Sequence, residues 1–400
     1  MKRGDAGRAG ERDGGWRGAA VWSSGFRPFF LAAAVYGPLL IASWYGARLG
    51  WWVLPASGVP LPLLHAHELL FGFAGALVCG VLLTALPSWS GAAELDRGRL
   101  AMLAATWLAG RAAVHGLPWL GAPLAALADC LLFPALALLL YATLRKARRR
   151  LFWWTLPPLA AFAWANIAFH IALGRGAEAQ AHAALLLGVH ALAFLFTLYG
   201  GLFIPAFTRR WLHARGERAA AILMPLEYAT AAAMVMFAWA DLTGAPWAAA
   251  AALAAAAIHA WRFARWRGWR TLGEPLLWCI HLGYAWLIAA LVLRAVSELV
   301  PAVPREAWIH AFTVGAYGML KIGLMTRVAL RHTGRPLRAS APMQAAFLMM
   351  LGAALLRLAY SVHGLGEWAL AASALLWAAP FLLYLAVHGP MLLAPSLPRR

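Results

Sequence analysis

Charged side chains are scarce in this chain, and acidic ones are the scarcest. Asp, Glu, Lys and Arg make up 12% of the 400 residues, about half of the roughly 25% that is typical of soluble domains. Hydrophobic residues account for 63%, and the mean hydropathy is +0.69. The composition therefore excludes an ordinary soluble domain and predicts a protein that crosses a membrane many times.

Two further absences exclude other classes of protein. The three cysteines, Cys79, Cys130 and Cys279, lie within apolar runs and show no paired spacing, which favours buried thiols over a disulfide framework. The sequence has no phosphate-binding loop, dinucleotide fingerprint or serine-hydrolase motif. ATP hydrolysis is therefore not supported.

Apolar runs long enough to cross a bilayer recur along the chain. Runs of about 18–25 residues predict an all-α polytopic bundle of about twelve transmembrane helices over 26–395, between a disordered tail at 1–25 and a short tail at 396–400. The expected centres are Val35, Gly75, Trp107, Phe133, Phe162, Phe194, Met234, Ala254, Trp286, Met319, Met350 and Trp377.

The net charge of +19 follows this topology. Of the 34 Lys and Arg residues, 27 lie in the N-terminal tail and in loops on the same side, three lie in the opposite loops and four lie inside spans. This is the positive-inside distribution, and it places both termini in the cytoplasm. The basic charge thus predicts contact with the lipid bilayer and no nucleic-acid partner.

One segment places ionisable side chains at the start of a predicted membrane span, where burying them costs free energy. His65, His67 and Glu68 precede a run from Leu69 to Leu86 that carries no charge. Such groups inside a membrane indicate a functional site by default. At about 100° per residue, His65 and Glu68 share a helical face and His67 points away. This spacing fits either two separate sites or a chain that is not yet helical at His65.

Seven of the 13 histidines gather at the outer boundary in this topology, and imidazole is the commonest ligand for haem iron, copper and zinc. Most of these histidines are explained as amphipathic side chains that anchor helix ends in the headgroup zone. His281 and His310 are stronger candidates. His281 lies about two turns inside a span with Tyr284 on its face, and His310 shares one helical stripe with Tyr317 and Lys321.

Lys321 and His190 are expected deep in the bilayer. A charge near the bilayer centre costs about 2.5–3.5 kcal/mol or more, so Lys321 requires a cavity, an anionic group or a carboxylate such as Glu227 or Asp129, unless it is neutral. A purely structural ion pair fits Lys321 as well as a functional role. His190 is a further candidate for binding a cofactor.

Seven segments carry motifs that together are similar to one known family. They are Gly25–Phe30, His65–Phe73, Leu83–Gly91, Gly200–Thr208, His281–Leu287, His310–Gly318 and Met325–Pro336. In this order they resemble the NnrS family of bacterial haem- and copper-containing inner-membrane proteins linked to nitric oxide. The resemblance runs from Phe26 to about Pro395. It implies that His65, His67, His281 and His310 occupy positions where ligands of haem b and of copper, or of iron or zinc as a second metal, are expected.

Two positions depart from the pattern of that family. Leu202 stands where Arg usually follows the Gly-Gly pair, and Lys321 stands where an apolar residue is usual. One hypothesis is that the cation has exchanged places, as the partner of a haem propionate or of a buried carboxylate.

The resemblance implies a haem–copper membrane protein that binds or reduces nitric oxide in nitrosative stress or denitrification. As an oxidoreductase of nitric oxide-reductase type, it would take electrons from quinol or a periplasmic cytochrome and use Glu68, Tyr284, Tyr317 and Lys321 as catalytic groups. A protective or sensing role without catalysis ranks close to this.

Two functions from other classes remain. The twelve-span layout and the intramembrane cations also suit a transporter, although no clear repeat relates the two six-span halves. The His-x-His sequence at a membrane boundary also suits an assembly factor that handles haem or copper.

Overall fold

The computed structural model describes residues 20–54, 58–145 and 150–398. Within these residues the chain is helical and has no strand. The α-helices are α1 (Phe26–Arg48), α2 (Leu61–His67), α3 (Gly75–Ser90), α4 (Arg97–His115), α5 (Leu117–Leu120), α6 (Ala122–Cys130), α7 (Leu132–Leu144), α8 (Leu156–Gly174), α9 (Glu178–His213), α10 (Met224–Thr243), α11 (Ala248–Arg265), α12 (Pro275–Val296), α13 (Ala307–His310), α14 (Met319–His332), α15 (Ala341–His363) and α16 (Glu367–Leu393). The π-helical segments are η3 (Glu68–Ala74) and η6 (Ala311–Gly318), and the 3₁₀ turns are η2 (Ala20–Ser23), η4 (Arg150–Thr155) and η5 (Gly268–Thr271).

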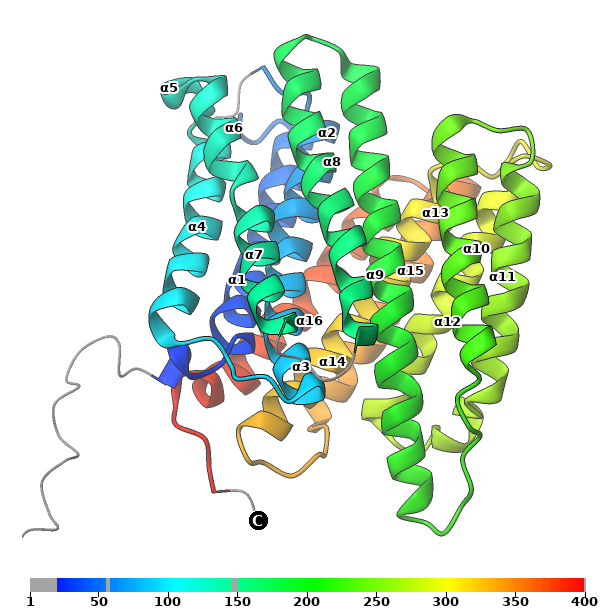
Figure 1. Ribbon diagram of the computed structural model, residues 1–400. Helices are drawn as coiled ribbons and strands as arrows, with labels where there is room; N and C mark the ends of the chain where they lie inside the picture. The colour runs from blue at the N-terminus through cyan, green and yellow to red at the C-terminus, as the bar shows by residue number, and fades with distance from the viewer. Residues whose placement is uncertain (1–19, 55–57, 146–149, 399–400) are drawn as a thin grey trace, which may run out of the picture.

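The prediction of an all-α membrane bundle is confirmed. Eight helical segments of the described residues are long and apolar enough to cross a membrane. Four more long segments, namely α4, α10, α11 and the run from α13 to α14, pack among them (Figure 1). Every predicted centre falls within one of these segments. The count of twelve crossings stays a prediction, because helices such as the arginine-bearing α4 are less apolar.

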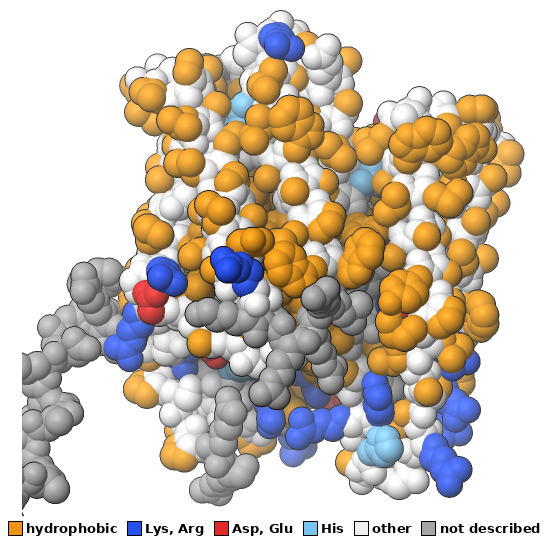
Figure 2. Space-filling view, viewed as in Figure 1, with side chains coloured by type: hydrophobic (Ala, Val, Ile, Leu, Met, Phe, Trp, Pro, Cys, Tyr) orange, Lys and Arg blue, Asp and Glu red, His pale blue; other side chains and the backbone are white. Residues whose placement is uncertain are grey.

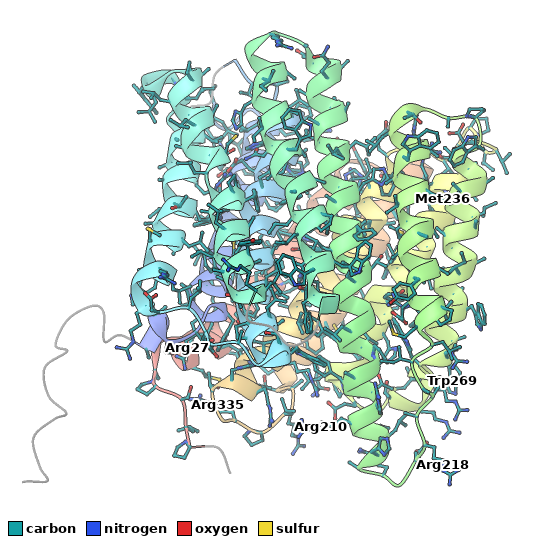
Figure 3. The ribbon with its side chains drawn as sticks, viewed as in Figure 1. Arg27, Arg210, Arg218, Met236, Trp269 and Arg335 are labelled. Carbon is teal, nitrogen blue, oxygen red and sulfur yellow. The ribbon has the colours of Figure 1, made fainter. Side chains whose placement is uncertain are left out.

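The two ends of the described chain lie at the same end of the bundle (Figure 1). Lys and Arg side chains gather at this end, below a broad belt of hydrophobic side chains (Figure 2). Arg27, Arg210, Arg218 and Arg335 all lie there in Figure 3. This arrangement fits the positive-inside prediction, and we call this end the inner end and the opposite one the outer end.

The expected terminal tails are only partly described. Residues 1–19 and 399–400 lie outside the described residues, and Ala20–Ser23 form the turn η2. The buried Arg27 guanidinium holds the other terminus, because it donates to the carbonyls of Leu392 and Ala394 at 2.7 Å each. These bonds satisfy carbonyls that the last turn of α16 leaves free.

The centre of the bundle is the run from α2 to α3. In its most apolar window, 94% of residues are buried inside the protein, against 28% in α15. The peripheral helices therefore turn most of their surface to lipid, and α2–α3 turns its surface to other helices. Polar groups on α2–α3 must accordingly find partners within the protein.

Both π-helical segments begin directly after a histidine. The segment η3 follows His67, and η6 follows His310. Single π-helical turns are rare and occur frequently at functional sites. They also disturb the regular backbone ladder, and here side chains bond two carbonyls of η3. Trp107 Nε1 donates to Gly72 O at 2.9 Å, and the Tyr317 hydroxyl donates to Ala74 O at 3.1 Å.

The same two regions share a sequence spacing. One has His67, Gly72, Gly75 and Gly80, and the other has His310, Gly315, Gly318 and Gly323. In each region, the first and last of the three glycines lie against side chains of the preceding long helix. These side chains are Tyr36 and Phe30 of α1, and Trp286 and Ile280 of α12. The second and tenth long segments are therefore an internal repeat, although none was expected between the two halves of the chain.

Labelling of single cysteines can test whether α10 and α11 cross the bilayer. In a cysteine-free background, we expect Thr243→Cys, at the end of α10, to react with a membrane-impermeant maleimide in intact bacterial spheroplasts. Ala214→Cys, at the inner end of α9, is the matched control and should react only after lysis. Both positions are exposed. If Thr243→Cys is protected in intact spheroplasts, these two helices do not form a crossing pair.

Candidate functional sites at the outer end and in the bundle interior

His67 lies in a buried polar cluster near the outer end. Its Nδ1 atom is 2.8 Å from Glu68 Oε1, and its Nε2 atom is 2.8 Å from Asn166 Oδ1. The Nε2 atom is also 3.1 Å from Asp129 Oδ2. All four side chains are buried. Both ring nitrogens of His67 thus face oxygen atoms that accept hydrogen bonds.

Arg111 of α4 links the two carboxylates of this cluster. Its Nη1 atom donates to Glu68 Oε1 at 2.5 Å, and its Nη2 atom pairs with Asp129. The Tyr36 hydroxyl donates to the other Glu68 oxygen. Glu68 follows His65 in α-helical geometry, and both side chains contact α1, Glu68 at Tyr36 and His65 at Trp44. The Glu68 carboxylate also reaches the guanidinium of Arg111 on α4.

A second histidine completes this cluster. His170 Nε2 lies 2.8 Å from Asp129 Oδ2. One ligand atom from each of His67, Asp129 and His170 lies within 4.8 Å of the others, which is close enough to hold one metal ion. A cavity of about 180 Å³ adjoins the two histidines. Sequence reasoning missed His170 as a ligand, although its spacing of four from Asn166 places both on one face of α8.

His65 and His310 form a separate cluster at the outer end. The His65 ring packs on Trp44 with 4.3 Å between centroids, and its buried Nδ1 atom has no hydrogen-bond partner among the described residues. Arg357 Nη2 lies 2.7 Å from His310 Nε2, and His310 Nδ1 lies 3.1 Å from Glu306 O. His65 is near enough to both Arg357 and His310 to interact electrostatically with them. The structure thus brings together two of the predicted ligands.

His190 lies in a third outer cluster, between α9 and α10. Its Nε2 atom is 2.9 Å from Asp241 Oδ2, and its buried Nδ1 atom has no hydrogen-bond partner. Asp241 also accepts from Arg294 Nε at 2.6 Å and from Arg305 Nη2 at 2.9 Å. Arg294 also pairs with Glu298 at 2.8 Å, so two guanidinium groups balance two carboxylates and this cluster, among the described residues, has no excess negative charge to attract a cation.

His281 lies apart from His310. Gly283 packs against Ala316 and Leu320, so His281 lies about ten residues below His310 along the bundle. That separation is roughly 15 Å at 1.5 Å per helical residue. His281 Nε2 bonds Thr208 Oγ1 at 2.8 Å, and its buried Nδ1 atom has no partner.

Tyr284 belongs to a buried network in the inner half and does not bond His281. Its hydroxyl lies 2.7 Å from His259 Nδ1 and accepts from Arg262 Nη1 at 3.0 Å. Arg262 pairs with Glu227, which is therefore not the partner of Lys321. The network joins α10, α11 and α12, and Gly201 of α9 packs directly on the Arg262 guanidinium.

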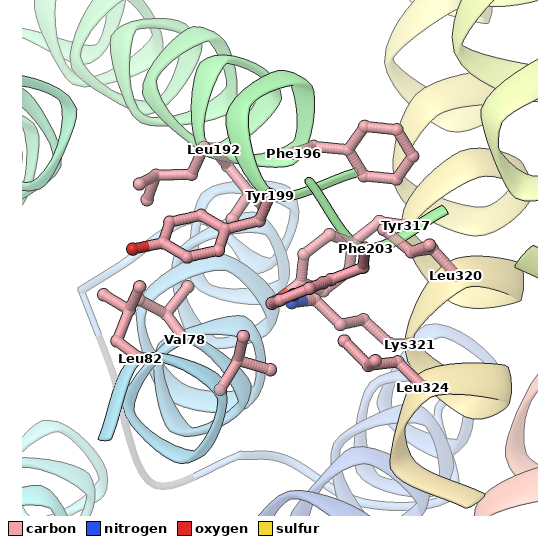
Figure 4. Close-up of a pocket in the computed structure, with 12 residues that line it drawn as sticks. Val78, Leu82, Leu192, Phe196, Tyr199, Phe203, Tyr317, Leu320, Lys321 and Leu324 are labelled. Carbon is pink, nitrogen blue, oxygen red and sulfur yellow. The ribbon is translucent and has the colours of Figure 1, made fainter. Parts of the chain in front are cut away.

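Lys321 points into a small cavity between α3, α9 and α14 (Figure 4). Its Nζ atom lies 4.8 Å from the centre of the Tyr317 ring. Among the described residues it forms no ion pair, since Asp129 and Glu227 are paired with arginines. The cavity volume is about 20 Å³, which is room for about one water molecule. Lys321 is thus solvated by an aromatic face and not by a carboxylate.

The Gly-Gly pair of α9 offers a test of the inner network. A methyl group at Gly201 would overlap the Arg262 guanidinium, so we expect Gly201→Ala to break the Arg262–Glu227 pair. Disrupting a buried ion pair costs about 3–5 kcal/mol. Gly200→Ala is the control, because its methyl group would meet the Tyr284 ring at an ordinary 3.5 Å. Unfolding in detergent measures both, and equal stability of the two variants would contradict the role of Arg262.

Comparison with known proteins supports the resemblance seen in the sequence. A family model described as NnrS protein matches residues 20–396, which is nearly the whole chain. A search of curated proteins found no match.

Proposed function

Because the chain belongs to the NnrS family, which links it in general terms to nitric oxide, we propose that it is a haem protein of the bacterial inner membrane that binds nitric oxide near its outer face. The haem-binding residues in this proposal are His65 and His310. The cluster that these two histidines form with Arg357 is the observation that carries it.

The state of each ring supports metal binding. The His310 Nδ1–H group donates to the Glu306 carbonyl, so the lone pair of His310 is on Nε2, where it accepts from Arg357 Nη2 at 2.7 Å. A metal ion bound at Nε2 would take the place of this hydrogen bond. A ligating histidine typically donates its other N–H group to a carbonyl or carboxylate in this way. The His65 Nδ1 atom is buried without a partner, and such an atom is costly unless it gains a bond. Haem iron coordinated here would supply the d-electrons that bind nitric oxide.

Arg357 supports haem more specifically than a bare metal ion. It is largely enclosed by the bundle, and among the described residues it forms no ion pair with a carboxylate. Its contacts are His310 Nε2 and Ser361 Oγ at 2.7 and 2.6 Å. A guanidinium is suited to bidentate recognition of a carboxylate. A haem carries two propionates, so Arg357 takes the role that the sequence suggested for Lys321.

Nitric oxide reaches such a site without a channel, because it is small, neutral and soluble in lipid. The proposal concerns binding, since reduction would also require an electron donor such as quinol or a periplasmic cytochrome and a supply of protons. Tyr284 and Lys321 lie in the inner half, and the Tyr317 hydroxyl bonds the Ala74 carbonyl. Of the four predicted catalytic residues, only Glu68 lies at the outer end.

A transporter is less well supported by these contacts. The cavity beside Lys321 has room for about one water molecule. The polar clusters that include His67, His190 and His310 lie toward the outer end, whereas transporters typically bind their substrate near the midplane.

The haem proposal predicts the effect of three substitutions. We expect His65→Ala and His310→Ala each to lower the haem content of the purified protein by about tenfold or more, because an iron ligand is lost. Arg357→Leu should weaken haem retention and shift the midpoint potential, because a propionate loses its cation. Pyridine haemochrome content, redox titration and the reduced spectrum with and without nitric oxide measure these effects.

The control is His182→Ala, an exposed histidine of α9 in the same outer zone. It should retain the haem content and the spectral response of the unmodified chain. Full haem content in both His65→Ala and His310→Ala, or no haem band in the unmodified protein after expression with added haem, would overturn the proposal.

A further inference from the structure

We propose that His67, Asp129 and His170 form a second metal site, distinct from the haem site, for one transition-metal ion of the copper–zinc class. The three residues come from α2, α6 and α8, so three separate helices hold the ligands in place. The site does not depend on the haem proposal, because it shares no residue with the His65–His310 cluster.

Two of the three separations between the ligand atoms are already close to those that a metal requires, and the third is within 4.8 Å. His67 Nε2 and His170 Nε2 lie 3.1 and 2.8 Å from the same oxygen, Asp129 Oδ2. Ligand atoms about 2.0–2.1 Å from a tetrahedral ion lie about 3.3 Å from one another. Small outward movements of the two rings therefore admit an ion, with no change in the helices.

The charges of the cluster call for one more positive charge. Glu68 and Asp129 carry two negative charges and Arg111 carries one positive charge, so the group has a net charge of minus one when His67 and His170 are neutral. The Nε2 atom of His67 faces only acceptors, Asn166 Oδ1 and Asp129 Oδ2. The space between Nε2 and these oxygens therefore holds either a proton or a metal ion, and a metal ion bound there offsets the negative charge of the cluster. Two imidazoles and one carboxylate suit Cu(II) or Zn(II).

The neighbouring groups are those that a metal site uses to orient its ligands. Glu68 Oε1 accepts from His67 Nδ1 at 2.8 Å, which leaves Nε2 free to coordinate. Arg111 occupies the other Asp129 oxygen, so Asp129 is a monodentate ligand through Oδ2. Such supporting partners typically change metal affinity by 10–100-fold when they are removed.

The adjoining cavity gives the ion a route and a free coordination position. Its volume is about 180 Å³, and its lining includes both histidines. Val59 and Gly174, at the ends of outer loops, line its other side. Three protein ligands beside an accessible cavity leave a fourth position for water or another small ligand.

The experiment loads the purified full chain with Cu(II), removes loosely bound metal with a competing chelator, and measures copper and haem iron in the same samples. We expect one retained copper per unmodified chain. His170→Ala should lower the affinity for copper by at least tenfold while haem iron stays unchanged. Glu68→Gln should lower it by about 10–100-fold, as expected for an orienting group. His182→Ala is the matched control and should bind copper like the unmodified chain.

His170 is the most useful position for substitution, because it lies at the edge of the cluster with a side chain that is 14% exposed. His67→Gln also removes a proposed ligand but lies in the buried centre of the cluster. If that variant does not fold, His170→Ala still tests whether the site binds copper. Copper retention by His170→Ala equal to that of the unmodified chain, or no retention by the unmodified chain, would overturn the proposal and leave a proton as the bound cation. Loss of haem iron with copper retained would instead count against the haem proposal.

Discussion

The absence of water in the hydrocarbon core is the constraint on which this structure depends. A buried charge in the bundle must find its partner on another helix, so each charged pair also joins helices. Arg111 joins α4 to the α2–α3 run and to α6, Arg262 joins α11 to α10, and Arg294 joins α12 to α10. Leaving one member of such a pair alone costs about 3–5 kcal/mol. The scarcity of charge in the sequence thus makes each remaining charge a determinant of helix packing.

Two of the four predicted intramembrane cations depart from this arrangement. Arg111 and Arg294 have carboxylate partners, whereas Arg357 and Lys321 have none among the described residues. The two differ in their surroundings. Lys321 has an aromatic face and a cavity of about 20 Å³, while Arg357 donates to the Nε2 atom of His310. Only Arg357 therefore combines an unpaired cation with metal-binding groups, and this combination distinguishes a cofactor site from a structural pair.

The sequence predicted the helices and the depth of most histidines, but not which residues meet. Depth follows from hydropathy and from the charge of the loops, which are properties of one segment at a time. Contacts depend on how each helix is rotated against its neighbours. Glu68 turns to Arg111 of α4, and Tyr284 turns to His259 and not to His281. Asp129 and His170 had no local motif to mark them, since their common partner is far away in the sequence.

The regions that begin at His67 and at His310 share one backbone pattern but favour two different kinds of ligand. Each histidine precedes a π-helical segment with the same glycine spacing, and each lies close to an arginine of the next long helix, the buried Arg111 or the half-buried Arg357. A comparison of two six-helix halves could not reveal this repeat, because the two segments lie eight helices apart. The difference lies in the carboxylates. Glu68 and Asp129 neutralise Arg111 and leave an excess negative charge that attracts a cation, whereas Arg357 lacks a carboxylate and is free to bind an anionic group. The same frame thus favours a bare metal ion beside His67 and a carboxylate-bearing cofactor beside His310.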